Sequence, residues 1–425
     1  MITALAVLLI LLILFGLPVF AGITAAAMLG LYTNGVDLSA VAIEMFRLAN
    51  APVLLAIPLF TFAGYLLSEG GTSERLVRFS RALLGWLPGG LGVVALVSCA
   101  FFTAITGATG VTIIALGGLL LPALLSERYT ERFSLGLMTT SGSLGLHFPP
   151  SLPLILFGFV SGASIETLFV AGVVPGAIMV GVLCGFSVLM GRKWRLESPR
   201  FSLRELASAA REVVWELPIP FLILLAIYTG FSTATEAAAL TVGYVLLVKV
   251  VVYREIRPFS DLPRIMVESM EMVGGILIIL GGALGFTNYL VDAFVPMKIL
   301  AAMEGAIETR LGFLLVLNGF LILVGCMMDI FSAILIVVPL VMPLAQKYGV
   351  DPVHLGVVFL ANLAIGYNTP PVGLNLFIAS SRFDKPIVTL YRATLPFLLL
   401  LLASLLLITY WPDLSLFLPR QLGLK

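Results

Sequence analysis

The sequence predicts an all-α polytopic membrane protein built from an inverted repeat, with two re-entrant hairpins and two discontinuous helices. Of its 425 residues, 60% are hydrophobic and 11% are charged, and the mean hydropathy is +1.12. Apolar stretches of bilayer length recur along the chain and match one another at a constant offset. A soluble domain carries about 25% charged residues, so one membrane bundle is favoured over several soluble cores.

Composition also excludes several other classes of protein. The formal net charge is +1, which argues against a nucleic-acid binder, and the high apolar content argues against a disordered chain. Cys99, Cys184 and Cys326 stand alone within apolar runs, so they are read as packing residues and not as a disulfide framework. No spacing of histidines, cysteines and carboxylates predicts a transition-metal site.

Simple membrane crossings need about 20 apolar residues each. The first of them lacks the basic start of a secretory signal and stays apolar beyond the length of one, so we expect it to be retained as a membrane helix. The sequence predicts crossings near residues 2–32, 51–69, 133–160, 165–190, 232–253, 266–291, 353–381 and 386–411, with a shorter one near 216–230.

Two further apolar stretches, 88–125 and 311–346, are about twice the length of one crossing. The first is interrupted at 106–110 by threonines and glycines, and the second around Met328 and Asp329. Each stretch could be two ordinary crossings or a re-entrant hairpin whose tip stops inside the membrane. The apolar flanks and small residues of the first tip favour the hairpin, because a loop that emerges into water does not need them.

The distribution of basic residues sets the predicted orientation. Short cytoplasmic loops concentrate Lys and Arg, so the polar stretch 191–215 is placed in the cytoplasm as a basic linker. Counting crossings from this linker puts both ends of 88–125 on the cytoplasmic side, and both ends of 311–346 outside. Two full crossings would satisfy the same count. The basic residues of the linker are Arg192, Lys193, Arg195, Arg200, Arg204 and Arg211.

The chain matches itself at an offset of 221 residues. Residues 145–150 align with 366–371, so that each segment ends in a Pro-Pro pair (371 − 150 = 221). Pro122 and Pro343, and Pro175 and Pro396, keep the same register, and amphipathic segments near 72–86 and 293–307 precede the hairpins. The predicted units are 1–190 and 216–425, oppositely oriented. Inverted repeats with matching helix breaks are typical of secondary transporters, whose sites lie near the bilayer midplane.

The Pro-Pro pairs predict half-helices at 133–145 and 151–160, and again at 353–366 and 372–381, because proline lacks an N–H and suits a new helix start. The carbonyls that end a first half-helix can ligate sodium, and the N–H groups that begin a second can hold a carboxylate. We expect one sodium ion between each tip and its break. The first set is Thr106, Gly107, Thr109, Ser141, Gly145 and Pro149, and the second is Met328, Asp329, Ser332, Gly366, Thr369 and Pro370.

Four further residues are expected to contact substrate, namely Thr112, Ser143, Ser151 and Asn375. Small residues could instead serve only close helix packing, Asp329 could cap a helix instead of joining an ion site, and Glu236 is expected to cap one. No Lys or Arg lies in either break or tip. The charge of an anionic cargo would therefore be met by helix N-termini, hydroxyls and co-bound cations, which favours a cation-coupled symporter. Sodium is the coupling ion in this interpretation, and no other cofactor is expected.

At these positions the sequence resembles the large membrane subunit of tripartite ATP-independent periplasmic (TRAP) transporters. The resemblance implies an elevator-type sodium symporter of a bacterial inner membrane that imports organic acids such as dicarboxylates, sialic acid or keto acids. The sequence departs from the common pattern of this family at residues 106–109 and at His147-Phe148. The stretches that carry it are IPLFTFAG at 57–64, TGATG at 106–110, SGSLGLHFPPS at 141–151, TEAAA at 235–239 and TPPVGLNLF at 369–377.

The resemblance also implies partners: a small membrane subunit of four helices, expected to be a separate chain, and a periplasmic binding protein that delivers the substrate. The alternative is a stand-alone cation and carboxylate symporter of related architecture that needs no binding protein. An intramembrane enzyme is disfavoured, because the sequence has no HExxH motif and no cluster of serine, histidine and acid at membrane depth.

Overall fold

The computed structural model describes residues 9, 12, 17–196, 200–229, 231–295, 297–298, 307 and 309–424, and every regular element among them is helical. Seven helices in this part of the chain are long and apolar enough to cross a membrane, which confirms a multi-pass membrane protein. They are α7 (Thr109–Ser126), α10 (Ile165–Trp194), the helix Ala234–Val252, α14 (Asp261–Asp292), α16 (Arg310–Met327), α17 (Ile330–Lys347) and α20 (Ile387–Tyr410).

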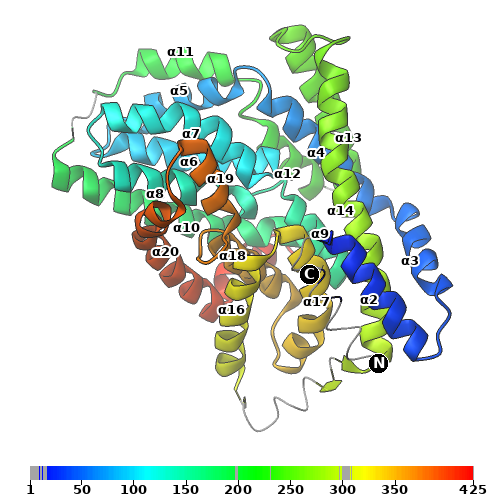
Figure 1. The fold of residues 1–425 in the computed structure, drawn as a ribbon. Coiled ribbons are helices and arrows are strands. Elements are labelled where there is room, and N and C mark those ends of the chain that lie inside the picture. Colours follow the sequence, from blue (N-terminus) through cyan, green and yellow to red (C-terminus); the bar gives the residue numbers. More distant parts are fainter. Residues whose placement is uncertain are drawn as a thin grey trace.

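One side of the molecule is organised around the long helix α14 (Figure 1). It packs against α2 (Val19–Thr33), α3 (Ser39–Ala49) and α4 (Ala56–Ser68), and α4 packs in turn against α13 (Ala234–Leu246). The 3₁₀ turn η1 (Pro52–Leu55) leads into α4, and the π-helix η3 (Leu247–Val252) continues α13. Helix α12 (Ile219–Tyr228) covers α13.

The remaining helices occur in two series of the same order. The first is α5 (Thr72–Leu84), α6 (Gly90–Thr106), α7, α8 (Glu131–Ser141), the 3₁₀ turn η2 (Leu144–His147), α9 (Leu152–Ser161) and α10. The second is α16, α17, α18 (Pro352–Gly366), α19 (Leu374–Phe383) and α20, followed by α21 (Asp413–Gln421). Helices α7 and α17 begin at Thr109 and Ile330, which are 221 residues apart, as are the Pro-Pro pairs.

The two series interlock around their breaks. Helix α7 packs against α19, α17 packs against α9, and α8 packs against α20, so each half of the chain supplies neighbours for the broken helix of the other half. A bend of 47° separates the segment Glu131–His147 from Leu152–Ser161. The predicted break in the first series is therefore present, although α8 ends at Ser141 and not near 145.

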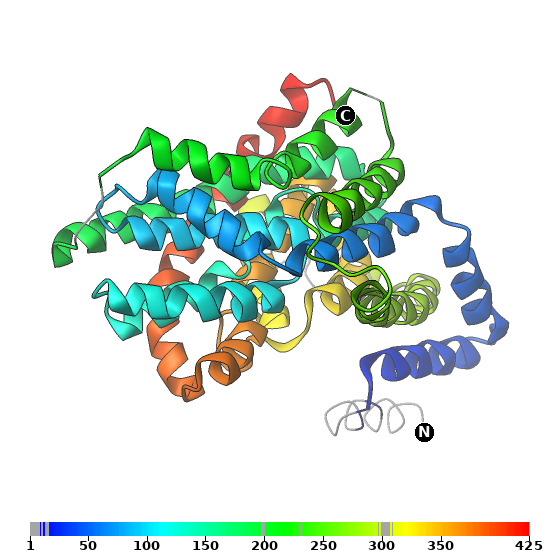
Figure 2. The same cartoon turned by 90° about the horizontal axis from the view of Figure 1, so that it is seen from above.

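Three helices were not predicted from the sequence, namely α3, α11 (Leu203–Val213) and α21. Helix α11 lies within the stretch expected to be a basic linker. The Ser202 hydroxyl accepts a hydrogen bond from the Glu205 N–H and so caps its start, and Arg211 stands in its last turn. Viewed from above, α11 lies along α5 (Figure 2). The segment expected to repeat α5 near 293–307 falls mostly outside the described residues, as does most of the stretch before Leu17.

A buried ionic cluster fastens α5 to the end of the helix Ala234–Val252. The side chains of Glu216 and Lys249 are both 0% exposed and lie 3.3 Å apart. Arg75 on α5 contacts Glu216 at 2.6 Å and Glu255 at 2.5 Å, and Lys249 Nζ contacts Glu255 at 2.8 Å. Thr72 donates a hydrogen bond to Glu216 at 2.8 Å. Every charge is paired, as burial of ions requires.

Candidate functional site

The first tip is a two-residue turn between α6 and α7. Gly107 has a φ of 68°, in the left-handed region that favours glycine, and Ala108 is extended. Inside the hairpin, the Thr103 hydroxyl lies 2.6 Å from the Thr112 hydroxyl and donates to the Gly142 carbonyl at 2.9 Å. Since Gly142 follows the last residue of α8, this contact fastens the first tip to the first break.

A glycine brings the first break against the backbone of α6. A Cβ on Gly145 would stand 2.6 Å from the Ala104 nitrogen, a distance that real Cβ atoms essentially never show. No other residue fits there without a shift of the helix. The tip and the break expected to share the first ion therefore lie in direct contact.

The second tip, between α16 and α17, is closed by a carboxylate. Asp329 is the N-cap of α17, where its Oδ1 accepts hydrogen bonds from the Phe331 and Ser332 N–H groups, both at 3.0 Å. The Ser332 hydroxyl donates to Asp329 Oδ2. Both roles considered for Asp329 involve this position: the capping role is observed, and its role as an ion ligand stays a prediction.

The second break contacts its tip at the position equivalent to the first. A Cβ on Gly366 would stand 2.6 Å from the Gly325 carbonyl carbon, and Gly366 and Gly325 are 221 residues beyond Gly145 and Ala104. The Gly373 N–H donates to the Cys326 carbonyl at 2.8 Å. The two halves of the chain thus use the same glycine contact to hold a tip against a break.

A chain of buried side-chain amides joins the two breaks to each other. The Ser143 hydroxyl donates to the Ala364 carbonyl at 3.0 Å and accepts from Asn368 Nδ2 at 3.1 Å. Asn368 Oδ1 in turn accepts from Asn375 Nδ2 at 3.3 Å, and Asn375 is 0% exposed. Asn375 Oδ1 has no hydrogen-bond partner in the described part of the chain, although buried polar atoms are normally paired.

Sequence comparison identifies the family of this chain. The family described as "Tripartite ATP-independent periplasmic transporter, DctM component" matches residues 6–414. The chain belongs to this family. It is 36% identical over 385 residues to the C4-dicarboxylate TRAP transporter large permease protein DctM of Pseudomonas aeruginosa, covering 90% of each chain. It is 35% identical over 435 residues to the protein of the same description from Rhodobacter capsulatus, covering 98% of each.

Two further likenesses extend this assignment. The isethionate TRAP transporter permease protein DctMQ of Oleidesulfovibrio alaskensis is 35% identical over 95% of this chain, which covers 64% of that protein. The crystal structure of the Alcanivorax borkumensis YdaH transporter shares the fold, with a TM-score of 0.60, 16% identity and 88% of each chain covered. This TRAP large permease is therefore related to proteins described as transporter permeases and not as enzymes.

The residues expected at the first ion site all lie at the first tip and break of the permease. The Thr109 hydroxyl has no hydrogen-bond partner among the described residues, so its oxygen is available. The Thr106 hydroxyl donates to the Phe102 carbonyl at 2.9 Å, and that of Ser141 to the Met138 carbonyl at 3.0 Å. Gly145 O accepts from the Phe148 N–H at 3.0 Å, which leaves it one lone pair. Gly107 and Pro149 are buried between the same elements.

The residues expected at the second ion site are more exposed to solvent. The Thr369 hydroxyl donates to the Ile365 carbonyl at 2.9 Å, and Gly366 O accepts from the Thr369 N–H at 2.9 Å. Pro370 is exposed, whereas its counterpart Pro149 is buried. Met328 is half-buried and ends α16 in an extended conformation. Sodium prefers such hydroxyl, carbonyl and carboxylate oxygens, but which of them bind an ion stays a prediction.

The four residues expected to contact substrate differ in how free they are. Ser151 caps α9, because its hydroxyl accepts from the Leu154 N–H at 3.4 Å and donates to the Leu146 carbonyl at 2.6 Å. Thr112 is engaged within the first hairpin, and Ser143 bridges the two breaks. Among these four residues, Asn375 alone has a buried side-chain atom without a hydrogen-bond partner in the described part of the chain. Asn375 is the second residue of α19, which has no side-chain N-cap, and its own N–H donates to the Tyr367 carbonyl at 3.1 Å.

Sequence reasoning missed several residues that build this site. Thr103 connects the first tip to the first break, and Asn368 connects the two breaks. The Tyr367 hydroxyl accepts a hydrogen bond from the Ile330 N–H at the second tip. Asn368 is the repeat equivalent of His147, and this correspondence was the available signal. Glu236 forms the predicted helix cap, in a capping box with Thr233.

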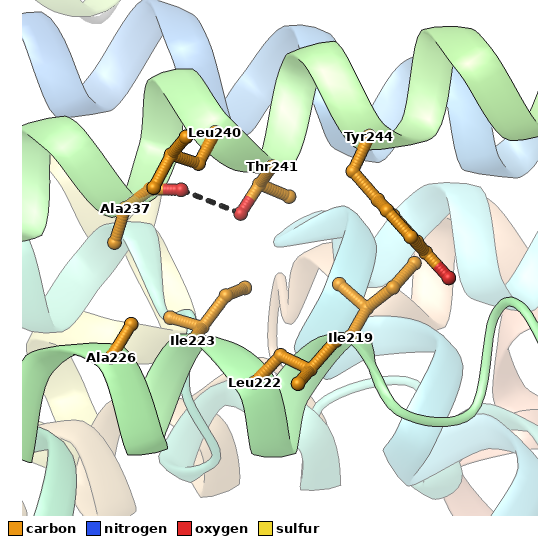
Figure 3. Close-up of a pocket in the computed structure, with 8 residues that line it drawn as sticks. All are labelled: Ile219, Leu222, Ile223, Ala226, Ala237, Leu240, Thr241 and Tyr244. Carbon is orange, nitrogen blue, oxygen red and sulfur yellow. Dashed lines mark hydrogen bonds between the residues drawn. The ribbon is translucent and has the colours of Figure 1, made fainter.

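A pocket of about 330 Å³ lies elsewhere, between α12 and α13 (Figure 3). Its walls are aliphatic apart from Thr241 and Tyr244. Both hydroxyls are engaged, since Thr241 donates to the Ala237 carbonyl at 2.7 Å and Tyr244 to the Trp215 carbonyl at 2.8 Å. A site for an acid anion needs free donors, which this pocket does not offer.

Proposed function

We propose that this permease imports an organic acid anion across the bacterial inner membrane, driven by co-transport of sodium ions. Two of its relatives are described as C4-dicarboxylate permeases and one as an isethionate permease, and all of these names denote anions of organic acids. In this proposal one sodium ion binds between each tip and its break. The anion binds between the two breaks, beside the Asn375 side chain in the first turn of α19.

One observation carries the proposal: the amide chain from Ser143 through Asn368 ends in the unpartnered carbonyl oxygen of Asn375. A buried amide oxygen without a partner costs free energy unless a ligand satisfies it. It can ligate a cation or accept a hydrogen bond from a substrate hydroxyl. Its position in the first turn of α19, at the positive end of the helix dipole, supports a site for an anion together with its coupling ion, although the Asn375 N–H itself donates to the Tyr367 carbonyl.

The proposed mechanism is of the elevator type. Helices α2, α3, α4, α13 and α14 pack together and contain neither break, and they would form the stationary part. The hairpins and broken helices would move across the membrane as one body that carries the site. The glycine contacts at Gly145 and Gly366 support this, because they join each tip to its break by backbone packing that does not depend on bound ligand.

The proposal includes two protein partners in addition to membrane lipid. A small membrane subunit of four helices would be a separate chain, and a periplasmic binding protein would deliver the anion. The printed name DctMQ of the isethionate relative, of which this chain covers 64%, supports a membrane partner that is fused in that protein. Substrate choice would rest largely with the binding protein.

Uptake into proteoliposomes tests the coupling. The permease is reconstituted with its small subunit and supplied with the binding protein and a radiolabelled C4-dicarboxylate. Uptake is expected to require an inward sodium gradient and to be unaffected by ATP. Uptake that is indifferent to sodium would contradict the coupling, and equal uptake by the permease alone would show a stand-alone symporter.

Two substitutions test the ion sites. Thr109→Val removes a hydroxyl that no described residue uses, and Asp329→Asn removes a charge while an oxygen remains to cap α17. Each should raise the sodium concentration that gives half-maximal uptake, by about ten-fold for the loss of one ligand of about 1.4 kcal/mol. Thr394→Val is the matched control, since the Thr394 hydroxyl bonds within its own helix, to the carbonyls of Leu390 and Tyr391. Unchanged sodium activation in both site variants would show that Thr109 and Asp329 do not bind the sodium ions.

A further inference from the structure

A second cavity lies far from the breaks, between the end of α5 and the chain that enters α11. Its volume is about 390 Å³. Helices α5 and α11 lie side by side (Figures 1 and 2), and Arg78 of α5 contacts Glu205 of α11 at 3.1 Å. The cavity is lined by Arg78, Arg81, Ala82, Trp86, Arg200, Phe201, Ser202 and Glu205.

The charged side chains of this cavity have unused capacity for an anion. Arg81 pairs with Glu127 at 2.6 Å through one nitrogen and is about half exposed, so its other donors are free to bind. Arg200 is exposed and has no hydrogen bond or ion pair to another described residue. Arg78 pairs with Glu205 and Glu212 of α11, and so holds α5 and α11 together at one wall of the cavity. Three guanidinium groups thus line the cavity with one carboxylate.

The other walls are aromatic and partly exposed. The rings of Trp86 and Phe201 meet edge to face, with centroids 6.4 Å apart, and each residue is about half exposed. The Trp86 indole N–H donates to the Leu83 carbonyl at 2.9 Å, which fixes the plane of the ring. Leu83 and Leu203 add exposed aliphatic surface beside them. Charged and aromatic groups side by side are typical of residues at the level of lipid headgroups.

We propose that this cavity binds the phosphodiester headgroup of an anionic phospholipid in the cytoplasmic leaflet. Arg81 and Arg200 would bind the phosphate oxygens, for which the guanidinium geometry is suited. Trp86, Phe201 and the neighbouring leucines would contact the glycerol backbone and the first carbons of the acyl chains. A soluble phosphate would need the arginines but would have no use for these apolar walls. The site rests on the predicted cytoplasmic placement of 191–215.

The test measures binding of phosphatidylglycerol to the purified full-length permease in detergent, by native mass spectrometry with phosphatidylcholine as the zwitterionic comparison. The double variant Arg81→Gln/Arg200→Gln should lose affinity for phosphatidylglycerol by about 25-fold, since each arginine near the membrane surface contributes about five-fold. The control Arg192→Gln/Arg211→Gln removes the same charge from α10 and α11 outside the cavity. It should leave the affinity within about two-fold of that of the unmodified protein.

Two results would overturn the proposal. The first is equal binding of phosphatidylglycerol by the cavity variant and the control variant. The second is displacement of the lipid by an excess of inorganic phosphate, which would assign the cavity to a soluble anion. The double variant Trp86→Ala/Phe201→Ala further distinguishes a lipid site from a site for a soluble anion. It should weaken binding of the lipid and not of inorganic phosphate. All variants are compared by size-exclusion profile, so that a folding defect is recognised before binding is measured.

Discussion

Replacing Gly366 by alanine should separate the second break from its tip. The new Cβ would stand 2.6 Å from the Gly325 carbonyl carbon and 2.7 Å from its Cα. Carbon atoms in favourable contact are about 3.5–4.0 Å apart, so the two backbones must move apart by about 1 Å. The φ of Gly366 is outside the left-handed region, so alanine adds a contact without backbone strain. Overpacking of this kind costs about 1–3 kcal/mol.

The expected result is a weaker second ion site. If the displacement is relieved at the tip, the sodium concentration for half-maximal uptake should rise by about five- to 150-fold, since each 1.4 kcal/mol corresponds to about a ten-fold change in affinity. Uptake into proteoliposomes over a sodium titration measures this shift. Unfolding in mixed micelles on addition of sodium dodecyl sulfate measures the stability of the same variant.

The control is the same substitution on α16, the helix that Gly366 contacts. Gly319 is exposed in the interior of this helix, and a Cβ there would meet nothing within 4 Å. Gly319→Ala should therefore stabilise the permease by about 1 kcal/mol through helix propensity, with unchanged sodium activation. If Gly366→Ala behaves like Gly319→Ala in both assays, the backbone contact between tip and break does not exist as described.

The remaining predictions concern the other contacts of the fold. Gly145→Ala should weaken the first ion site in the same uptake assay, because its Cβ would meet the Ala104 nitrogen at 2.6 Å; normal sodium activation would contradict this. Lys249→Met should destabilise the permease by about 3–5 kcal/mol, since it leaves buried carboxylates short of one cation, and Lys249→Met/Glu255→Gln should recover part of that loss in micelle unfolding. Burial acts to raise the pKa of Glu255, but hydrogen bonds from Arg75 and Lys249 lower it to about 2. Its contribution to stability is thus present above pH about 4.5 and lost as the pH falls toward 2, and Glu255→Gln should remove that part of the pH dependence.

The sequence was sufficient to locate the helix breaks because local chemistry determines them. A Pro-Pro pair cannot continue a helix, and Gly107 allows a left-handed turn, so both features act within a few residues of chain. The offset of 221 residues then placed each of these features a second time, in the other half of the chain. Helix ends were less predictable, as at Ser141, where α8 gives way to a 3₁₀ turn earlier than expected.

Contacts between distant segments could not be predicted in this way. Thr103 stands in an apolar helix like many buried threonines, and only the fold brings it to the Gly142 carbonyl. The pairing of Glu216 with Lys249 could not be predicted, because 33 residues and a helical hairpin separate them (249 − 216 = 33). Helices α11 and α21 were missed for another reason, since neither is long and apolar enough to be read from hydropathy.

The two breaks share one pattern but differ in their surroundings. Pro149 and Pro150 are buried, whereas Pro370 and Pro371 are exposed. Because both halves carry the same unit, each already displays a shape that the other could adopt. In a transporter that alternates between two states, an exchange of these surroundings would bury Pro370 and Pro371 and expose Pro149 and Pro150, so solvent accessibility at the two breaks should change in opposite directions.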